Sequence, residues 1–223
     1  MLYIIGLGLN EKGISKEGLL AIEKSKKVYL ESYTVDFPYK IADLHLGKKI
    51  VKLKREDVES EKLIKEAKSK KISLLVYGSP LFATTHMSLI LDAEKAGVNV
   101  KIIYSAGVFD ALGETGLQLY KFGKIASMPK QDNSDFLKYV KENQKIKAHS
   151  LILVDIGLSY KESLRRLQVK EKIIICSQLG TEKSEIYYGK IDKLKNKDVK
   201  APFCFIVPGE LHFLEKEAIE RFG

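Results

Sequence analysis

The chain has 223 residues, 45% of them hydrophobic and 30% charged, and its formal net charge at pH 7 is +9. Such a composition excludes a disordered or fibrous protein, and a chain of this length buries about 70% of its unfolded surface without needing a disulfide or a metal. Its basic residues are mostly lysines interleaved with glutamates, and no RNA-reading motif is present. The charge therefore indicates solubility, with a secondary role in steering towards an acidic partner or an RNA-rich assembly.

The first half of the chain alternates segments typical of strands with segments typical of helices. Apolar runs predict strands at residues 2–8, 27–32, 50–53, 72–78 and 98–105. Helices are expected from an N-cap at Ser15 to about Lys26, in a short segment after Pro38, from Ser60 to Lys70, and after an N-cap at Thr85 with Gly97 as the C-terminal stop. This α/β alternation predicts a largely parallel sheet with helices on both faces.

The second half has a different pattern. Helices are predicted at residues 134–144, 160–167 and 210–222, and strands at 149–157, 172–179, 184–191 and 201–209. Three of these strands follow one another with little helix between them, so mixed or antiparallel pairing is expected. The change of pattern predicts two α/β/α domains, at residues 1–106 and 107–223.

Both cysteines lie inside apolar runs without C-x-x-C spacing. Cys176 and Cys204 are therefore predicted to be buried strand thiols, which favours a reducing cytoplasm. The apolar start of the chain is short and has no basic region before it, so it predicts a first strand and no membrane span.

The segment from Tyr104 to Lys124 is interrupted by four glycines that a plain amphipathic helix does not need. Such a segment is typical of a ligand loop or of an interdomain linker, and the residues alone leave both open. The glycines are Gly107, Gly113, Gly116 and Gly123.

Two further glycine turns are candidate phosphate or cofactor sites. The turn after the first strand has Glu11 where a dinucleotide fingerprint needs a third glycine, and Ile14 where a P-loop needs its lysine. Glu31 is placed to grip a ribose, but a tight strand-to-helix turn is the simpler interpretation of Gly6 and Gly8.

The second turn, YGSPLFATTH at residues 77–86, directly follows a buried strand, where open α/β sheets place ligands. Pro80 fixes the turn, and Thr84 and Thr85 offer hydroxyl groups. A lone histidine such as His86 is more often a packing residue than a catalytic one, and no carboxylate is near it in sequence. His45, His149 and His212 show no mutual ligand spacing, so no metal site is expected.

Several motifs occur in an order that resembles the diphthine synthases of the tetrapyrrole methylase superfamily. They are LYIIGLGLNEKGIS, VYLESYT, REDVE, YGSPLFATTH, GETGLQLYKFGK, LILVDI and FIVPGELHFLE. The resemblance implies two α/β/α domains with a cleft between them, a homodimer, and S-adenosylmethionine as the cofactor. It also implies methylation of the amino group on a modified histidine of translation elongation factor 2, with no membrane and no direct nucleic-acid binding.

The resemblance places the cofactor contacts on eight residues and assigns no catalytic residue. Ser79 replaces an acidic residue that the family usually has, and Phe203 replaces a polar one. The resemblance also shows a second domain that is short after Ile156. The eight residues are Leu9, Ser79, Phe82, Gly107, Val108, Val154, Leu179 and Phe203.

Two other functions stay open at this stage. A tetrapyrrole or ribosomal RNA methyltransferase of the same superfamily would share the fold and the cofactor. A non-catalytic, lysine-rich binding module is favoured only by the charge and by Ser79.

Overall fold

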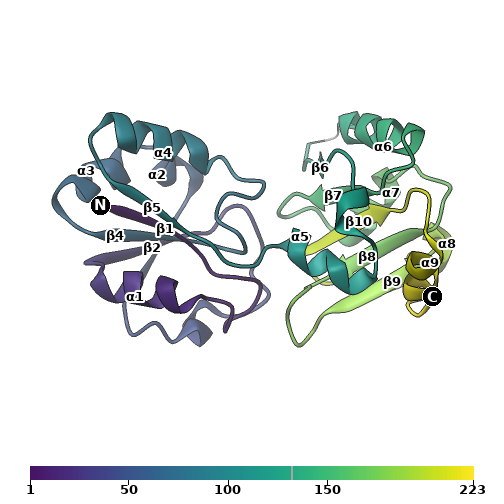
Figure 1. Ribbon diagram of the computed structural model, residues 1–223, viewed down its shortest axis with the longest axis horizontal. Coiled ribbons are helices and arrows are strands. Elements are labelled where there is room, and N and C mark those ends of the chain that lie inside the picture. Colours follow the sequence, from purple (N-terminus) through teal and green to yellow (C-terminus); the bar gives the residue numbers. More distant parts are fainter. Residues whose placement is uncertain (132) are drawn as a thin grey trace. The chain divides into compact units, whose positions relative to one another are not determined.

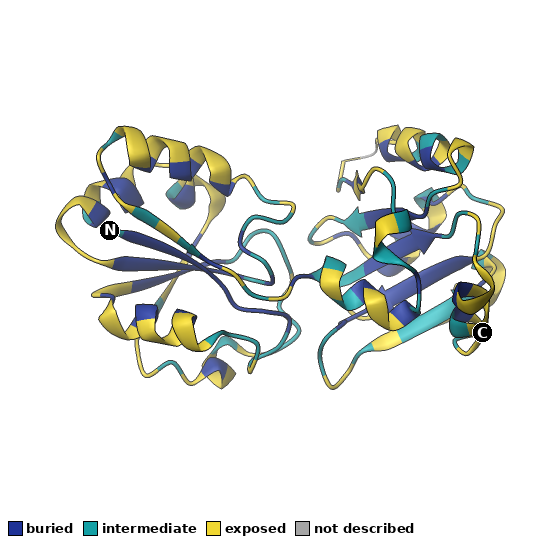
Figure 2. Ribbon diagram, viewed as in Figure 1, coloured by how far each residue is buried: buried dark blue, intermediate teal, exposed yellow. Residues whose placement is uncertain are grey.

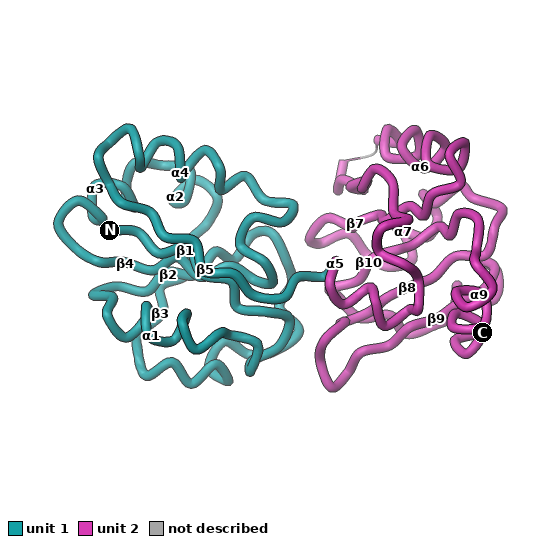
Figure 3. Tube along the Cα trace, viewed as in Figure 1, with its two compact units in different colours: residues 1–108 teal, residues 109–223 magenta. Residues whose placement is uncertain are grey.

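The computed structural model describes residues 1–131 and 133–223. Within them the chain divides into two compact units, Met1–Val108 and Phe109–Gly223, and each unit has its own five-stranded sheet (Figure 1, Figure 3). The chain therefore has the expected α/β class with two sheets. The domain boundary expected after residue 106 lies close to the boundary between these units.

The sheet of the first unit is parallel throughout, in the order β3-β2-β4-β1-β5. This arrangement confirms the expectation from the alternating pattern. Its strands are β1 (Leu2–Gly6), β2 (Lys27–Glu31), β3 (Ile50–Leu53), β4 (Ile72–Val76) and β5 (Val100–Ile103). Its helices are α1 (Lys16–Lys24), the 3-10 turn η1 (Ile41–Leu44), α2 (Arg55–Val58), α3 (Lys62–Ser69) and α4 (His86–Lys95).

Helices cover both faces of this sheet because successive strand residues point to opposite sides. Leu2 and Ile4 of β1 belong to one core, which also contains apolar side chains of α3 and α4. Tyr3 and Ile5 belong to a second core with side chains of α1 and η1. Strands β1 and β4 are buried along their whole length (Figure 2). A strand buried on both faces shows a continuous apolar run in its sequence.

The sheet of the second unit is mixed, in the order β6-β7-β10-β8-β9, with β6 parallel to β7 and the other neighbours antiparallel. Helices α6 and α7 contribute to the core on one of its faces. The strands are β6 (Ala126–Met128), β7 (Ser150–Val154), β8 (Ile173–Ser177), β9 (Glu185–Gly189) and β10 (Phe203–Val207). The helical elements are α5 (Val108–Ala111), η2 (Leu112–Thr115), η3 (Leu119–Lys121), α6 (Asp135–Lys145), α7 (Tyr160–Arg166), α8 (Ile191–Leu194) and α9 (Phe213–Glu220).

The predicted helix ends were partly right. Ser15 caps α1 as expected, with its Oγ accepting the N–H of Gly18 at 3.1 Å. Thr85 occupies the N-cap position of α4, but its side chain makes no capping hydrogen bond. The last helix begins at Phe213 after an N-cap at His212, three residues later than predicted.

Cys176 and Cys204 are buried, free thiols at partner positions of β8 and β10, which confirms that they are strand thiols. No helix in the described part of the chain is long and apolar enough to cross a bilayer.

Candidate functional site

Three loops meet at the carboxyl edge of the first sheet, where β1, β4 and β5 end. A Cβ atom on Gly6 would lie 2.6 Å from the Gly78 oxygen and 3.1 Å from the Ser105 nitrogen, so only glycine fits there. The loops are also hydrogen-bonded, since the Gly78 N–H donates to the Gly8 oxygen at 2.9 Å. The backbones of the three loops are therefore so close at Gly6 that no side chain fits between them.

Two side chains fix these loops to one another. The Tyr77 hydroxyl donates to the Leu9 oxygen at 2.9 Å, and the Ser105 hydroxyl donates to the Gly13 oxygen at 2.7 Å. The ring of Phe37 packs edge-on against Tyr77, with 5.3 Å between ring centroids. Burial raises the pKa of Tyr77 above its ordinary value, so the phenol stays protonated and keeps its donor role.

Five of the eight expected cofactor contacts lie in this unit, and three of them are brought together at the glycine-rich edge. A Cβ atom placed on Gly78, the residue before Ser79, would lie 3.6 Å from the Gly107 Cα and 3.8 Å from the Leu9 Cδ2. Leu9 and Gly107 are buried, and Ser79 is half-buried. The other two are also half-buried: Phe82 lies in the same loop as Ser79, and Val108, the last residue of the first unit, begins α5.

The loop at residues 79–85 is closed by hydrogen bonds to a single carbonyl. The Pro80 oxygen accepts from the Thr84 hydroxyl at 3.3 Å and contacts His86 Nδ1 at 3.1 Å. Ala83 has a φ of 54°, in the left-handed region that favours glycine. The hydrogen bonds hold this loop in a conformation that its own sequence does not prefer.

A carboxylate does lie beside His86, although none is near it in sequence. Glu31, the last residue of β2, places Oε2 3.5 Å from His86 Nε2, and both side chains are 1% exposed. The other oxygen of Glu31 accepts the backbone N–H groups of Tyr33 and Thr34 at 3.2 and 3.0 Å. This buried position contradicts the idea that Glu31 grips a ribose. The carboxylate fixes the turn after β2 instead.

The other three expected contacts lie at one edge of the second sheet. Val154 ends β7, Phe203 begins β10, and Leu179 follows the end of β8. Since β7 and β8 are both antiparallel to β10, these three positions share an edge. Phe203 packs edge-on against Tyr160 with 5.9 Å between centroids. An aromatic residue at this position therefore extends the core of the unit.

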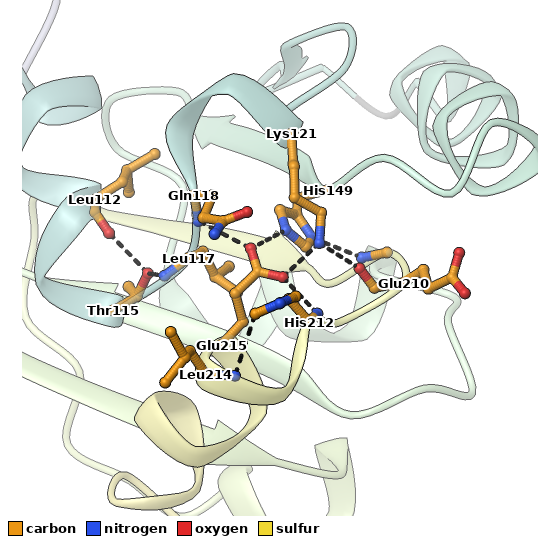
Figure 4. A network of polar contacts seen from close by, with 11 residues as sticks. Leu112, Thr115, Leu117, Gln118, Lys121, His149, Glu210, His212, Leu214 and Glu215 are labelled. Atoms are coloured by element: carbon orange, nitrogen blue, oxygen red, sulfur yellow. Dashed lines mark hydrogen bonds and ion pairs between the residues drawn. The ribbon is translucent and has the colours of Figure 1, made fainter.

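The segment GETGLQLYKFGK, residues 113–124, is held to the C-terminal helix by one buried carboxylate (Figure 4). Glu215 Oε1 accepts the Gln118 N–H at 2.9 Å and faces His149 Nε2 at 3.1 Å. Its Oε2 accepts the His212 N–H at 2.8 Å and is bonded by the ammonium group of Lys121. Sequence reasoning missed this network because its members are far apart along the chain.

The hydrogen bonds determine the charge states in this network. Burial opposes ionisation of Glu215, but the Lys121 ammonium and the surrounding N–H donors outweigh it and lower its pKa to about 2. Burial lowers the pKa of His149, which stays neutral at pH 7. A neutral ring agrees with its contacts, because His149 Nδ1 accepts the Gly209 N–H at 2.9 Å and Nε2–H is left to donate to Glu215.

Gly116 lets the same segment pack directly on α9. Its φ is 83°, and a Cβ atom there would lie 2.2 Å from the Ala218 Cβ. The Arg221 guanidinium adds a hydrogen bond to the Glu114 oxygen at 2.8 Å. Glycine is therefore required at this position for packing and for backbone conformation together.

An open cavity of about 640 Å³ lies beside this network, and Tyr120, Lys121, Ile146, Glu210 and Leu211 are among its lining residues. Tyr120 and Ile146 are 82% and 70% exposed. The network thus fixes the backbone of one wall of a surface cavity. The side chains of Tyr120 and Ile146 in this cavity remain accessible.

Comparisons with known proteins give consistent results. The family model of tetrapyrrole (corrin/porphyrin) methylases matches residues 1–195. Diphthine synthases of Methanococcus maripaludis and Methanocaldococcus jannaschii are each 37% identical to this chain over 99% of its length and 98% of theirs. A crystal structure of diphthine synthase superposes with a TM-score of 0.94 at 33% identity, covering 100% of this chain and 95% of that one.

Proposed function

Because this chain belongs to the tetrapyrrole methylase family, and within it to the diphthine synthases, we propose that it methylates the amino group of a modified histidine in translation elongation factor 2. The chain is a methyltransferase that acts in diphthamide biosynthesis. The observation that carries the proposal is the 37% identity with diphthine synthases over 99% of the chain. The proposed methyl donor is S-adenosylmethionine.

The glycine-rich edge of the first sheet fits this donor. Gly6, Gly8 and Gly78 leave backbone where other residues would place side chains, and Leu9 gives the same edge an apolar component. An adenine ring and a thioether require mostly apolar walls with a few backbone donors and acceptors. We assign the cofactor contacts to Leu9, Ser79, Phe82, Gly107 and Val108 of the first unit and to Val154, Leu179 and Phe203 of the second.

The proposed chemistry needs no side chain that acts as an acid or a base. When bound, S-adenosylmethionine supplies a methyl group already activated by the sulfonium. The acceptor amine has a reference pKa of about 8, so its deprotonation near neutral pH costs on the order of 1 to 3 kcal/mol. Alignment of two bound reactants supplies roughly 7 to 11 kcal/mol. This chain therefore binds and orients the methyl donor and the acceptor amine, and water or a nearby polar group accepts the proton.

We assign the substrate side to the segment from Glu114 to Lys124. Its backbone is fixed by Glu215, Arg221 and the packing at Gly116, and this rigidity supports the assignment because a fixed wall aligns a bound partner. Tyr120, which is 82% exposed, is available to contact a protein surface.

Two measurements test the proposed function. Calorimetric titration with S-adenosylhomocysteine is expected to show saturable binding, and a flat titration would contradict the cofactor assignment. Incubation with S-adenosylmethionine and one acceptor at a time is expected to label elongation factor 2 that carries the modified histidine. Elongation factor with an unmodified histidine is the matched control. Methyl transfer to a tetrapyrrole or to ribosomal RNA instead would move the chain to another branch of its family.

We also propose that the chain forms a homodimer in the cytoplasm. Met87 and Leu91 are exposed apolar side chains on α4, and Leu19 and Leu20 are exposed on α1 at the opposite face of the sheet, so each helix offers an apolar surface for a protein contact. Sedimentation equilibrium is expected to give twice the 25.2 kDa chain mass, and the chain mass itself would contradict the dimer.

A further inference from the structure

The side chains of Glu31 and His86 form a buried pair of polar groups. His86 Nε2 and Glu31 Oε2 face each other at 3.5 Å. Neither atom has any hydrogen-bond partner among the described residues. Both side chains are 1% exposed, so water at the surface does not satisfy them.

The contact on the other side of the ring sets the position of a proton. His86 Nδ1 lies 3.1 Å from the Pro80 carbonyl oxygen, which can only accept, so Nδ1 carries hydrogen. In a neutral ring Nε2 would then present a lone pair to the lone pairs of a carboxylate. Two acceptors facing each other in a buried place are costly. One further proton between Nε2 and Oε2 removes this repulsion.

His86 directly follows the loop at residues 79–85 and closes it through the contact of Nδ1 with the Pro80 oxygen. Glu31, at the end of β2, faces the other side of the same ring. The strained φ of Ala83 shows that the loop depends on such support. The same loop carries Ser79 and Phe82, two of the proposed cofactor contacts.

We propose that Glu31 and His86 are positioning residues that share one buried proton and thereby hold the 79–85 loop in the shape that binds the cofactor. This inference rests on the proposed function. The pair does not touch the reacting atoms, so its effect is on cofactor affinity and not on the methyl-transfer step.

Three variants separate this role from simple packing. Glu31→Gln keeps the geometry, because its amide can donate to Nε2 of a neutral ring while its oxygen still accepts from Tyr33 and Thr34. His86→Gln keeps a group near Nε2 but loses the bond to Pro80. Ser73→Ala is the control, since it removes a buried 2.7 Å hydrogen bond to Ser25 at the opposite end of β4.

The dissociation constant of S-adenosylhomocysteine is the first measurement. His86→Gln is expected to weaken binding about tenfold, from the loss of one buried hydrogen bond that orders the loop, whereas Glu31→Gln stays within about threefold of the parent chain. Ser73→Ala is expected to bind as the parent does. In methyl transfer, His86→Gln raises KM for the cofactor and leaves kcat within about twofold.

Nitrogen-15 NMR of the histidine rings tests the shared proton in the unaltered chain. The His86 signal, identified by its loss in His86→Gln, is expected to show a protonated Nδ1 together with a proton held at Nε2. In Glu31→Gln, Nε2 is expected to lose this proton while Nδ1 stays protonated. An unprotonated Nδ1 in the parent chain, the same Nε2 signal in the parent and Glu31→Gln, or equal cofactor affinity in the parent and His86→Gln, would overturn the inference. If the parent chain itself fails to bind S-adenosylhomocysteine, the proposed function fails instead.

Discussion

Replacing Glu215 with glutamine tests the network that holds the segment at residues 113–124. The carboxylate accepts hydrogen bonds from Gln118, Lys121 and His212, and it faces His149. A glutamine of the same shape places an N–H₂ group against some of these donors. The substitution thus removes a buried charge and sets donor against donor.

The size of the effect follows from the pKa. The pKa of the Glu215 carboxyl is lowered from 4.5 to about 2. Since one pKa unit corresponds to about 1.4 kcal/mol, the folded state favours the ionised form by about 3 kcal/mol. A carboxyl whose folded pKa is lowered stabilises the fold above its unfolded pKa and loses this contribution as the pH falls. The stabilisation is therefore present at pH 7 and disappears between about pH 5 and pH 2.

Urea denaturation monitored by circular dichroism measures the contribution of Glu215 to the free energy of unfolding. Glu215→Gln is expected to lower the free energy of unfolding at pH 7 by about 3 kcal/mol and to flatten its decline below pH 5. Glu210→Gln is the matched control, because Glu210 lies shortly before Glu215 in the chain but its ion pair with Lys147 is exposed. A loss of less than about 1 kcal/mol in Glu215→Gln, or an acid dependence equal to that of the parent, would contradict the role of this carboxylate.

Three further predictions concern single positions. Gly116→Ala is expected to lower the free energy of unfolding by about 3 kcal/mol in thermal or urea unfolding, because its φ is positive and its Cβ would clash with Ala218. Gly113→Ala is the control and stays within about 0.5 kcal/mol of the parent, because the space around its Cβ is open. Equal losses in the two variants would contradict the packing of Gly116 on α9. Gly107→Val is expected to weaken S-adenosylhomocysteine binding in calorimetry more than it lowers the melting temperature, and unchanged affinity would remove Gly107 from the cofactor site. Cys176, whose pKa is raised by its contact with Cys204 and by burial, is expected to react with a thiol reagent only on unfolding, and rapid labelling of the folded chain would contradict its burial.

The strands were the most predictable part of this fold. Continuous apolar runs such as ISLLV in β4 are buried on both faces, and this burial is what the sequence pattern reports. Strand β6 and helix α8 were missed because three and four residues carry no measurable periodicity. The start of the last helix was misplaced because His212 and Glu215 form its N-terminal cap, and histidine is not among the usual capping residues.

The sequence predicted the turns at the candidate site but not how they pack. Gly6 and Gly8 indicated only a tight turn after β1, whereas the structure shows that Gly6 also lets the loops after β1, β4 and β5 approach one another closely. The two buried histidine–carboxylate contacts were not predictable, because Glu31 meets His86, and Glu215 meets His149, only through strand order and helix packing. A glutamate at the end of an apolar strand, as in VYLE, was the one local signal for such a contact.

Methyl transfer to the side-chain amine of the modified histidine is measured by tandem mass spectrometry of the histidine-containing peptide, after elongation factor 2 has been incubated with this chain and S-adenosylmethionine. We predict a mass gain in whole multiples of a methyl group, located on the amine of the modified side chain and absent without the cofactor. An unchanged peptide, or methyl groups on another residue, would contradict the proposed function.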